Sequence, residues 1–487
     1  MKAVRQAVID IGSNTVRLVV YAGLPRAPLP IYNEKSRVKL GACLAGDGII
    51  DKATMKKALA ALARFETLAK AMKVDTMRVV ATAATREAKN GAELVEKAAA
   101  LGIHVEVLDG DAEATAAGFG ILSDNPHANG YVGDLGGGSL ELIRISDGKL
   151  GTRVSLPLGT LRHDILKGKT TKQISQMLRD DIAKAMGKGN FPIETGLPFY
   201  MIGGSWRTLA RLHMHQTGYP LTILSNYEMP ADAPDIMMAM VNDKDALTRS
   251  NVVATGRISA LPGANALLAG ISGLLKPSTL ITSIYGLREG LLFEQLTPAE
   301  RQDDPLIAAA RFEGERLGRF PFHGDALAQW MAPVFAGQSP NDARLCRAAC
   351  LLSDSVWNVN PEYRADHALD LALDGSWPGV NASDRAVIAA ALWTVHAGKR
   401  TLPEMLTALA TPGALAQAVI WGLAIRLAHR LDGGTGGALA DSRIDGDGAT
   451  LRLHLTGSAV RLQSNSVQRR LQALGEALGY AQAEILG

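Results

Sequence analysis

Two stretches of this sequence repeat one pattern of residue types, and the pattern suits the binding of an anion. The first reads IDIGSNTVRLVV and places Asp10 before a turn that contains Ser13, Asn14 and Thr15. The second reads VGDLGGGSLELI and places Asp134 before another glycine-rich turn. Glycine lets the backbone approach a ligand, and successive turn N–H groups can surround an anion. Each stretch therefore predicts a phosphate-binding loop between two strands, although a single copy would equally fit a plain hairpin turn.

The second copy strengthens the phosphate interpretation. Its turn contains Gly136, Gly137 and Gly138 before Ser139, and three consecutive glycines cost conformational entropy unless close backbone approach is needed. The aspartates that end the two buried strands are expected to face each other across a cleft. Because carboxylates repel a bound phosphate, such a pair of loops calls for a divalent cation, and Mg²⁺ with oxygen ligands is the natural choice.

The segments around these loops predict two related α/β lobes in tandem. After the first loop, helix-like and strand-like segments alternate, and the same order restarts at Gly130. A strand that reads PFYMI then leads through Gly203, Gly204 and Ser205 into a helix. Backbone N–H groups at this helix start would complete the phosphate cradle, although the segment read alone is only a strand-to-helix turn.

The length of 487 residues favours three or four domains. The turn-rich segment 297–305 is the best linker, because helical periodicity without strand signals follows it until about residue 431. A flexible GGTGG segment then precedes a predicted hairpin and a closing helix. We therefore expect lobes at 1–120 and 121–298, a helical domain at 299–434, and a small α+β tail at 435–487.

Composition gives weaker guidance. A net charge of +3 with 47% hydrophobic residues is ordinary for a globular protein, and no uninterrupted apolar run approaches the roughly 20 residues of a membrane span. The N-terminal residues show no secretory signal, and three cysteines give no disulfide framework. We expect a cytoplasmic protein that binds neither membrane nor nucleic acid.

Seven motifs occur in the order and spacing of the exopolyphosphatase/guanosine pentaphosphate phosphohydrolase (Ppx/GppA) family, which the chain resembles over roughly residues 5–295. They are DIGSNTVRLVV, VVATAATRE, EVLDGDAEATAAGFGIL, VGDLGGGSLELI, YMIGGSWRTLA, RISALPGANAL and YGLREGLLFE. The resemblance implies two actin-like lobes of the ASKHA, ribonuclease H-like type, followed by an HD-like helical domain. It also implies a homodimer that uses Mg²⁺ to remove a terminal phosphate from inorganic polyphosphate or from guanosine pentaphosphate (pppGpp).

The resemblance assigns catalytic roles to Glu113 and Arg86. Glu113 matches the base that activates water, and Arg86 matches the arginine that steadies the transferred phosphate. The family's first acid is Ala112 here and its serine is Asp109, so this stretch departs from the usual pattern. Read without the family, Glu113 would be a surface acid that favours a helix N-terminus, and Arg86 would be an exposed arginine.

The resemblance also suggests metal-binding and polyanion-binding residues. Asp134, Glu141 and Asp10 match acids associated with the metal, although Glu141 could instead be an outward-facing strand residue. The helical domain has Ser353 and Asp354 where an HD-type site needs a His-Asp pair, and His367 and His396 are isolated, so we expect no second active site. The basic residues expected to line a polyanion path are Arg17, Arg162, Lys167, Lys169, Lys172, Arg207 and Arg211.

The sequence thus predicts an exopolyphosphatase, with pppGpp hydrolysis as the alternative within the same enzyme class. An ATP-binding, actin-like or chaperone-like switch is the alternative from another class. Sugar or acetate kinase activity also fits the fold, but a kinase excludes water, whereas the expected role of Glu113 is to activate it.

Overall fold

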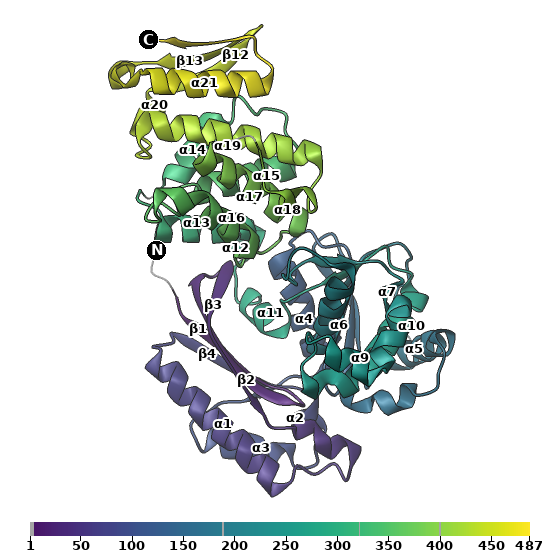
Figure 1. The fold of residues 1–487 in the computed structure, drawn as a ribbon. Coiled ribbons are helices and arrows are strands. Elements are labelled where there is room, and N and C mark those ends of the chain that lie inside the picture. Colours follow the sequence, from purple (N-terminus) through teal and green to yellow (C-terminus); the bar gives the residue numbers. More distant parts are fainter. Residues whose placement is uncertain (1–3, 188, 321, 399–400) are drawn as a thin grey trace. The chain divides into compact units, whose positions relative to one another are not determined.

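The computed structural model describes residues 4–187, 189–320, 322–398 and 401–487, and the chain divides into two compact units, Met1–Pro305 and Leu306–Gly487. The first unit contains two α/β lobes, each built on its own mixed sheet (Figure 1). The second unit is helical and ends in a small three-stranded sheet. The four-part division expected from the sequence stays a prediction at its finer boundaries.

The first lobe has a five-stranded sheet in the order β3-β2-β1-β4-β5. Strands β1, β2 and β3 are antiparallel, and β4 is parallel to β1. Helices α1 and α3 lie along one side of this sheet (Figure 1). The elements are β1 (Gln6–Ile11), β2 (Thr15–Leu24), β3 (Ala27–Arg37), α1 (Lys52–Ala71), β4 (Thr76–Ala81), α2 (Ala83–Glu87), α3 (Gly91–Ala99) and β5 (Glu106–Val107).

The second lobe repeats this plan in a six-stranded sheet of order β10-β11-β9-β6-β7-β8. Strands β6, β7 and β8 are antiparallel and β9 is parallel to β6, as β4 is to β1. Its strands are β6 (Gly130–Leu135), β7 (Leu140–Ser146), β8 (Lys149–Leu156), β9 (Phe199–Ile202), β10 (Tyr227–Met229) and β11 (Leu280–Thr282). Its helices are α5 (Thr171–Met186), α6 (Gly204–Thr217), α7 (Ala233–Ile236), α8 (Met238–Asn242), α9 (Lys244–Arg249) and α10 (Leu261–Leu275).

Two helices that carry site residues, α4 (Gly110–Asp124) and α11 (Leu287–Phe293), cross at very short range. A Cβ on Gly290 would lie 1.8 Å from the carbonyl oxygen of Ala116, and a Cβ on Gly120 would lie 2.4 Å from that of Gly286. Side chains would separate the two backbones, so these glycines fix the distance between the helices. Helix α12 (Pro298–Gln302) closes the unit.

Two features of this unit were not anticipated from the sequence. Strand β3 contains Pro28 and Pro30, which read as loop signals, but β3 is an edge strand, where a missing N–H can face solvent. The stretch Thr255–Leu275 is long and apolar enough to cross a membrane by composition. Most of α10 within it is buried in the core of the second lobe, which is typical of a core helix.

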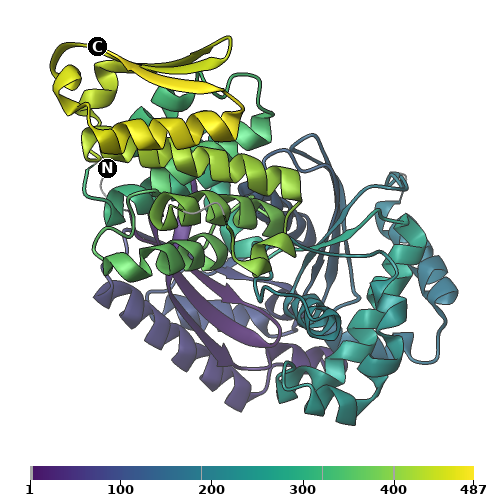
Figure 2. The same ribbon diagram turned by 45° about the horizontal axis from the view of Figure 1, so that its top comes forward.

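The second unit buries α17 and α19 among shorter helices, and α21 packs on α19 and on the three-stranded sheet β12-β13-β14 (Figures 1 and 2). Its three-stranded sheet and α21 lie in the last part of the chain, and the HD-like domain and the tail stay predictions in their details. The helices are α13 (Pro305–Leu317), α14 (His323–Met331), α15 (Pro340–Leu352), α16 (Arg364–Asp374), α17 (Ala382–Ala397), α18 (Glu404–Thr407), α19 (Pro412–Asp432), α20 (Gly437–Ala440) and α21 (Asn465–Leu478). The strands are β12 (Ser442–Asp447), β13 (Thr450–Leu455) and β14 (Gln482–Leu486).

Candidate active site

The two glycine-rich turns have the same backbone hydrogen bond. In the first loop, residues 12–15, the N–H of Gly12 donates to the carbonyl of Thr15 at 3.0 Å. In the second loop, residues 136–139, the N–H of Gly136 donates to the carbonyl of Ser139, also at 3.0 Å. The repeat seen in the sequence is therefore a repeat of local structure, because each loop joins two antiparallel strands in the same way.

Two glycines of the second loop are needed because this loop lies against the first loop and against the start of α2. A Cβ on Gly137 would lie 2.8 Å from Cβ of Ser13, and a Cβ on Gly138 would lie 2.9 Å from Cβ of Ala83. Neither glycine has a positive φ, so close approach rather than backbone freedom explains them. Gly203 differs: its φ is 116°, and its Cα faces the carbonyl of Leu135 at the end of β6. The predicted loops 12–15, 136–139 and 203–205 thus come together.

Glu113 lies in the first turn of α4 and is only 7% exposed. The helix begins at this point because the side chain of Asp109 caps it, accepting the N–H of Ala112 at 2.8 Å. Nη1 of Arg86 lies 3.2 Å from Oε2 of Glu113 and donates to the carbonyl of Leu108 at 2.7 Å. Burial raises the pKa of Glu113 to about 7, against the lowering effect of Arg86, and Asp134 and Asp10 raise it further.

Two acids and a serine of the second lobe form a row across three strands, which we call the second row: Asp134, Glu141 and Ser155. In the sheet register Asp134 lies opposite Glu141, and Glu141 lies opposite Ser155. The Ser155 hydroxyl donates to Oε1 of Glu141 at 2.8 Å. Burial raises the pKa of Asp134 to about 6, and burial together with Glu113 and Asp134 raises that of Glu141 well above its usual range. Glu141 is 1% exposed, so it points inward and is not the outward-facing residue that its alternation allowed.

The matching positions of the first lobe form the first row: Asp10, Arg17 and Lys35. Asp10 faces Arg17 in β2, and Arg17 faces Lys35 in β3. Nε of Arg17 donates to Oδ1 of Asn33 at 2.8 Å. Burial raises the pKa of Asp10, while Arg288 and Arg17 oppose the rise. The first row therefore keeps one acid but replaces the second with a cation.

Helix α11 contributes charged residues whose roles the sequence reasoning did not assign. Nη1 of Arg288 lies 3.7 Å from Oδ2 of Asp10. Oε1 of Glu289 accepts the Tyr21 hydroxyl at 2.5 Å, and its other oxygen accepts the N–H of Gly286 at 2.9 Å. The sequence signal for these residues is the Arg-Glu pair in the motif YGLREGLLFE. Two adjacent charges of opposite sign in an otherwise apolar helix require partners elsewhere in the protein.

The predicted basic residues do not all converge. Arg207 lies near Asp134, and Arg17 near Asp10, as electrostatic partners. Arg162 instead pairs with Glu87 of the first lobe, and Lys167 pairs with Asp164 on the surface. Arg162 and Lys167 thus already form ion pairs with acids of the protein, and the polyanion path stays a prediction.

The acids near the loops suit Mg²⁺ only together with oxygen atoms of water and of a bound substrate. Among the residues that the structure describes, no three His, Cys, Asp or Glu side chains are placed to hold a metal ion. Mg²⁺, however, is commonly held by one or two carboxylates together with water and substrate phosphates. Asp134, Glu141 and Asp10 supply the right donor atoms, and burial is the main cause of the raised pKa of each carboxyl group.

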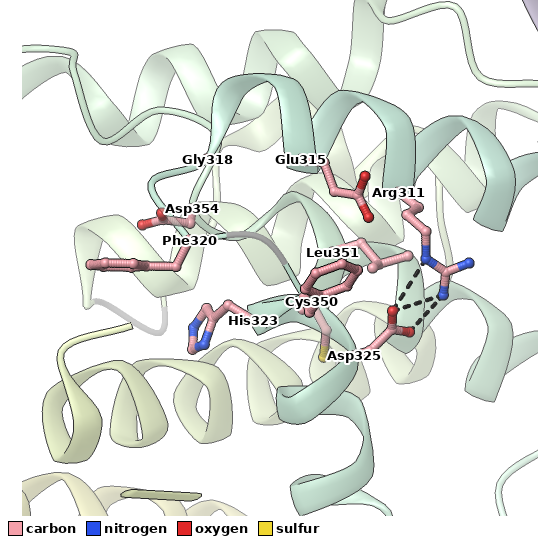
Figure 3. Close-up of a pocket in the computed structure, with 12 residues that line it drawn as sticks. Arg311, Glu315, Gly318, Phe320, His323, Asp325, Cys350, Leu351 and Asp354 are labelled. Carbon is pink, nitrogen blue, oxygen red and sulfur yellow. Dashed lines mark hydrogen bonds and ion pairs between the residues drawn. The ribbon is translucent and has the colours of Figure 1, made fainter. Parts of the chain in front are cut away.

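In the helical unit, the Ser353-Asp354 position is already occupied by protein contacts. The Asp354 carboxylate accepts Nε of Arg319 at 3.0 Å, and the Ser353 hydroxyl donates to the carbonyl of Cys350 at 2.8 Å. Asp354 and His323 line a pocket that also includes Phe320 and Arg311 (Figure 3). Burial lowers the pKa of His396 to about 4, and His367 is exposed. That this unit has no second active site stays a prediction.

The first unit has the actin-like fold that the sequence predicted, and its site combines glycine loops with acids. Residues 19–299 match the Ppx/GppA phosphatase family, and residues 306–485 match the C-terminal domain of exopolyphosphatase. The chain belongs to the Ppx/GppA phosphatase family, whose members are hydrolases that act on phosphoanhydride bonds.

Individual relatives are distant. The guanosine-5'-triphosphate,3'-diphosphate pyrophosphatase of Vibrio cholerae is 24% identical over 87% of both chains. Retrograde regulation protein 2 of Saccharomyces cerevisiae is 25% identical over 62% of this chain, which spans 58% of that relative.

Solved structures confirm the fold of the first unit. A Ppx/GppA family member from Aquifex aeolicus has a TM-score of 0.53 at 23% identity, over 62% of this chain and all of that one. An exopolyphosphatase from Cytophaga hutchinsonii has a TM-score of 0.52 at 22% identity, over 60% and 99% of the two chains.

Proposed function

We propose that this protein is an exopolyphosphatase that releases orthophosphate from the end of inorganic polyphosphate. The observation that carries the proposal is the position of Glu113, a buried carboxylate beside Arg86 and close to Asp10 and Asp134, the acids that precede the two glycine loops. Hydrolysis of a phosphoanhydride needs a group that orients and deprotonates water in line with the leaving group. A carboxyl group with a pKa of about 7 can accept a proton at neutral pH and release it afterwards.

In this mechanism the three loops hold the terminal phosphate. Backbone N–H groups of the loops 136–139 and 203–205, with the hydroxyls of Ser13 and Thr15, surround its oxygens. Arg86 binds the transferred phosphoryl group, and Glu113 takes the proton of the attacking water. The contact between Arg86 and Leu108 holds the guanidinium at the start of α4, so that the base and the phosphate ligand stay together.

Asp134, Glu141 and Asp10 would hold Mg²⁺ against the substrate. When bound, the ion neutralises the negative charge of the phosphates and stabilises the leaving oxygen. The acids of the site then no longer repel the anionic substrate. The expected homodimer and cytoplasmic location remain predictions from the family resemblance.

The name of the Vibrio cholerae relative favours a second candidate, hydrolysis of pppGpp, because that relative aligns over 87% of both chains. The same loops and base would act on the 5′ terminal phosphate of this nucleotide. Long-chain polyphosphate competing against pppGpp hydrolysis would show that both substrates use one site.

The test is orthophosphate release from long-chain polyphosphate with Mg²⁺, comparing the wild type with Glu113→Gln. We expect the substitution to lower kcat by about 10²-fold or more, the contribution typical of a general base. Asp111→Asn is the matched control: Asp111 lies in the same helical turn but pairs with Arg153 at 2.6 Å, and its loss should change kcat by less than about threefold.

Circular dichroism and thermal melting establish that both variants fold. A Glu113→Gln enzyme that keeps more than a tenth of the wild-type kcat would contradict the role of Glu113. A wild type that cleaves pppGpp but not polyphosphate would establish the second candidate instead.

A further inference from the structure

Helices α1 and α3, which lie side by side in the first lobe (Figure 1), border a groove that the candidate active site does not use. Residues 49–63, before and in α1, and residues 90–101, along α3, line it, and we call it the α1–α3 groove. Its volume of about 750 Å³ lies within the roughly 300–1,000 Å³ of a typical ligand pocket. The N–H of Ile50 donates to Oδ1 of Asn90 at 2.8 Å, and Nδ2 of Asn90 donates to the carbonyl of Ile50 at 3.0 Å. These two hydrogen bonds fix the walls of the groove to each other at this end.

The floor of the α1–α3 groove is apolar. Met55, Leu59 and Ala63 line it at intervals of four residues, so they share one face of α1. Leu101 lines the opposite side, just after α3, and is 48% exposed, while Ile49 at the beginning of the groove is 46% exposed. Exposed apolar side chains that gather in one groove, unlike ones scattered singly, are typical of a binding site for an apolar group.

Two lysines border this floor near the start of α1. Lys52 and Lys56 lie about one helical turn apart and both line the groove. Glu93, which Lys52 approaches, already pairs with Lys97 at 2.6 Å, and the Asp51 carboxylate caps α1 by accepting a backbone N–H at 2.9 Å. In the part of the chain that the structure describes, no acid forms an ion pair with Lys52 or Lys56. The groove therefore offers two cations beside an apolar floor, and its complement is an anion with an apolar body.

The size of the groove decides between the occupants of this kind. From Lys52 to Ala63, α1 rises by about 16 Å, and a protein helix of that length and a diameter of about 10 Å would occupy about 1,300 Å³. The groove provides about 750 Å³, so it holds a hydrocarbon chain better than a helix. A second copy of this chain that docked through the same face would bring the lysines of both copies together, and like charges repel.

We propose that the α1–α3 groove binds a fatty acid as its carboxylate anion. The ammonium groups of Lys52 and Lys56 donate charge-assisted hydrogen bonds to the carboxylate. The hydrocarbon chain lies along Leu59 and Ala63 towards Leu101, where it removes apolar surface from water. No residue that lines the groove belongs to the glycine loops or to the acids of the candidate active site, so this ligand binds independently of the phosphate substrate.

The experiment is calorimetric titration of the full chain with dodecanoate, at concentrations below those at which it forms micelles. We expect the wild type to bind one equivalent. The double variant Lys52→Gln, Lys56→Gln should bind about 10-fold more weakly, because hydrogen bonds to a charged head group are lost. Ala63→Phe leaves both lysines in place but fills the apolar floor, and it should weaken binding by a similar factor or more.

Reversal of the charge tests the head group separately from the chain. Dodecyltrimethylammonium has the same hydrocarbon chain as dodecanoate but a cationic head, so the wild type should prefer dodecanoate. The variant Lys52→Glu, Lys56→Glu should prefer the cation instead. The matched control Lys57→Glu, Lys184→Glu changes the net charge equally at two exposed lysines that do not line the groove, and it should keep the wild-type preference. An equal change of preference in the control would show a general charge effect and overturn the proposal.

Circular dichroism and thermal melting establish that the variants fold. A wild type that does not bind dodecanoate, or one that binds several equivalents with an affinity that no variant changes, would overturn the proposal. A capped peptide with leucine and glutamate in helical spacing supplies the remaining comparison. If this peptide binds to the groove more tightly than dodecanoate does, the occupant is a protein helix and the proposal is wrong. None of these measurements depends on hydrolysis of polyphosphate.

Discussion

The two lobes repeat one hairpin and one strand order, yet matching positions hold different charges. The first row carries Arg17 and Lys35 after its aspartate, whereas the second row carries Glu141 and Ser155 after its own. A duplicated backbone supplies two turns of the same geometry, and single side chains on the neighbouring strands then give each lobe its own chemistry. Under the proposed function, Arg17 of the first lobe attracts the anion, while Asp134 and Glu141 of the second lobe hold the metal together with Asp10 of the first.

The largest expected effect is the dependence of the rate on pH. The base must be ionised to accept a proton, so kcat/KM should rise with pH through about 7, the pKa to which burial raises Glu113. Two pH units below that value the rate should be about 100-fold below its plateau, since a tenfold loss accompanies each unit. The pH–rate profile is measured at saturating Mg²⁺, with an alkaline plateau as the expected form. A profile that is flat between pH 5 and 8 would show that neither Glu113 nor another carboxyl group of the site titrates in the step that limits the rate.

The rows themselves are compared by Glu141→Gln and Arg17→Gln. Loss of a carboxylate that supports a metal typically costs about 10- to 100-fold in activity, so the first substitution should act mainly on kcat. Loss of a cation that binds the substrate should act mainly on KM, by about 10-fold, the worth of a hydrogen bond to a charged group. Ser155→Ala serves as the control for the second row, because it removes only the hydroxyl that contacts Glu141. Equal effects of the two main substitutions on kcat and KM would remove the proposed difference between the lobes.

The smallest effect concerns the loops. Gly137→Ala places a Cβ 2.8 Å from Cβ of Ser13 and should destabilise the fold by about 1–3 kcal/mol, as overpacking does. Gly12→Ala places its Cβ 3.4 Å from the nearest atom, an ordinary contact, and should change stability little. Chemical denaturation of both variants measures the difference. Equal stability would mean that the second loop is free to move away from the first.

Much of the first unit could be predicted from the sequence because its signals are local. Alternating apolar residues, glycine turns and helical periodicity predicted the paired hairpins and the alternation of strands and helices after them. Strand β3 escaped because Pro28 and Pro30 are typical of loops, and only its place at the sheet edge makes them acceptable. Missing β3 meant missing Lys35 and the position of Arg37 opposite Thr15.

Prediction of the site from the sequence has the same limit, because it too depends on local signals. The family resemblance assigned Glu113, Arg86 and the acids, and none of these assignments required knowing which chain segments meet. Arg288 and Glu289 received no role because their partners, Asp10 and Tyr21, are more than two hundred residues away in the chain. Long-range pairs leave no periodic pattern, so the sequence gives no local sign of them.

By itself, then, the sequence determined the two loops, their flanking strands and the family, since these depend on residue types at short spacing. Only the tertiary structure decided why Gly137 and Gly138 are needed, which carboxylates are buried, and which distant charged groups pair. The physical reason is that close approach, burial and charge balance depend on which distant segments meet. Gly137 against Ser13, and Arg288 beside Asp10, are contacts between segments that are far apart in the chain.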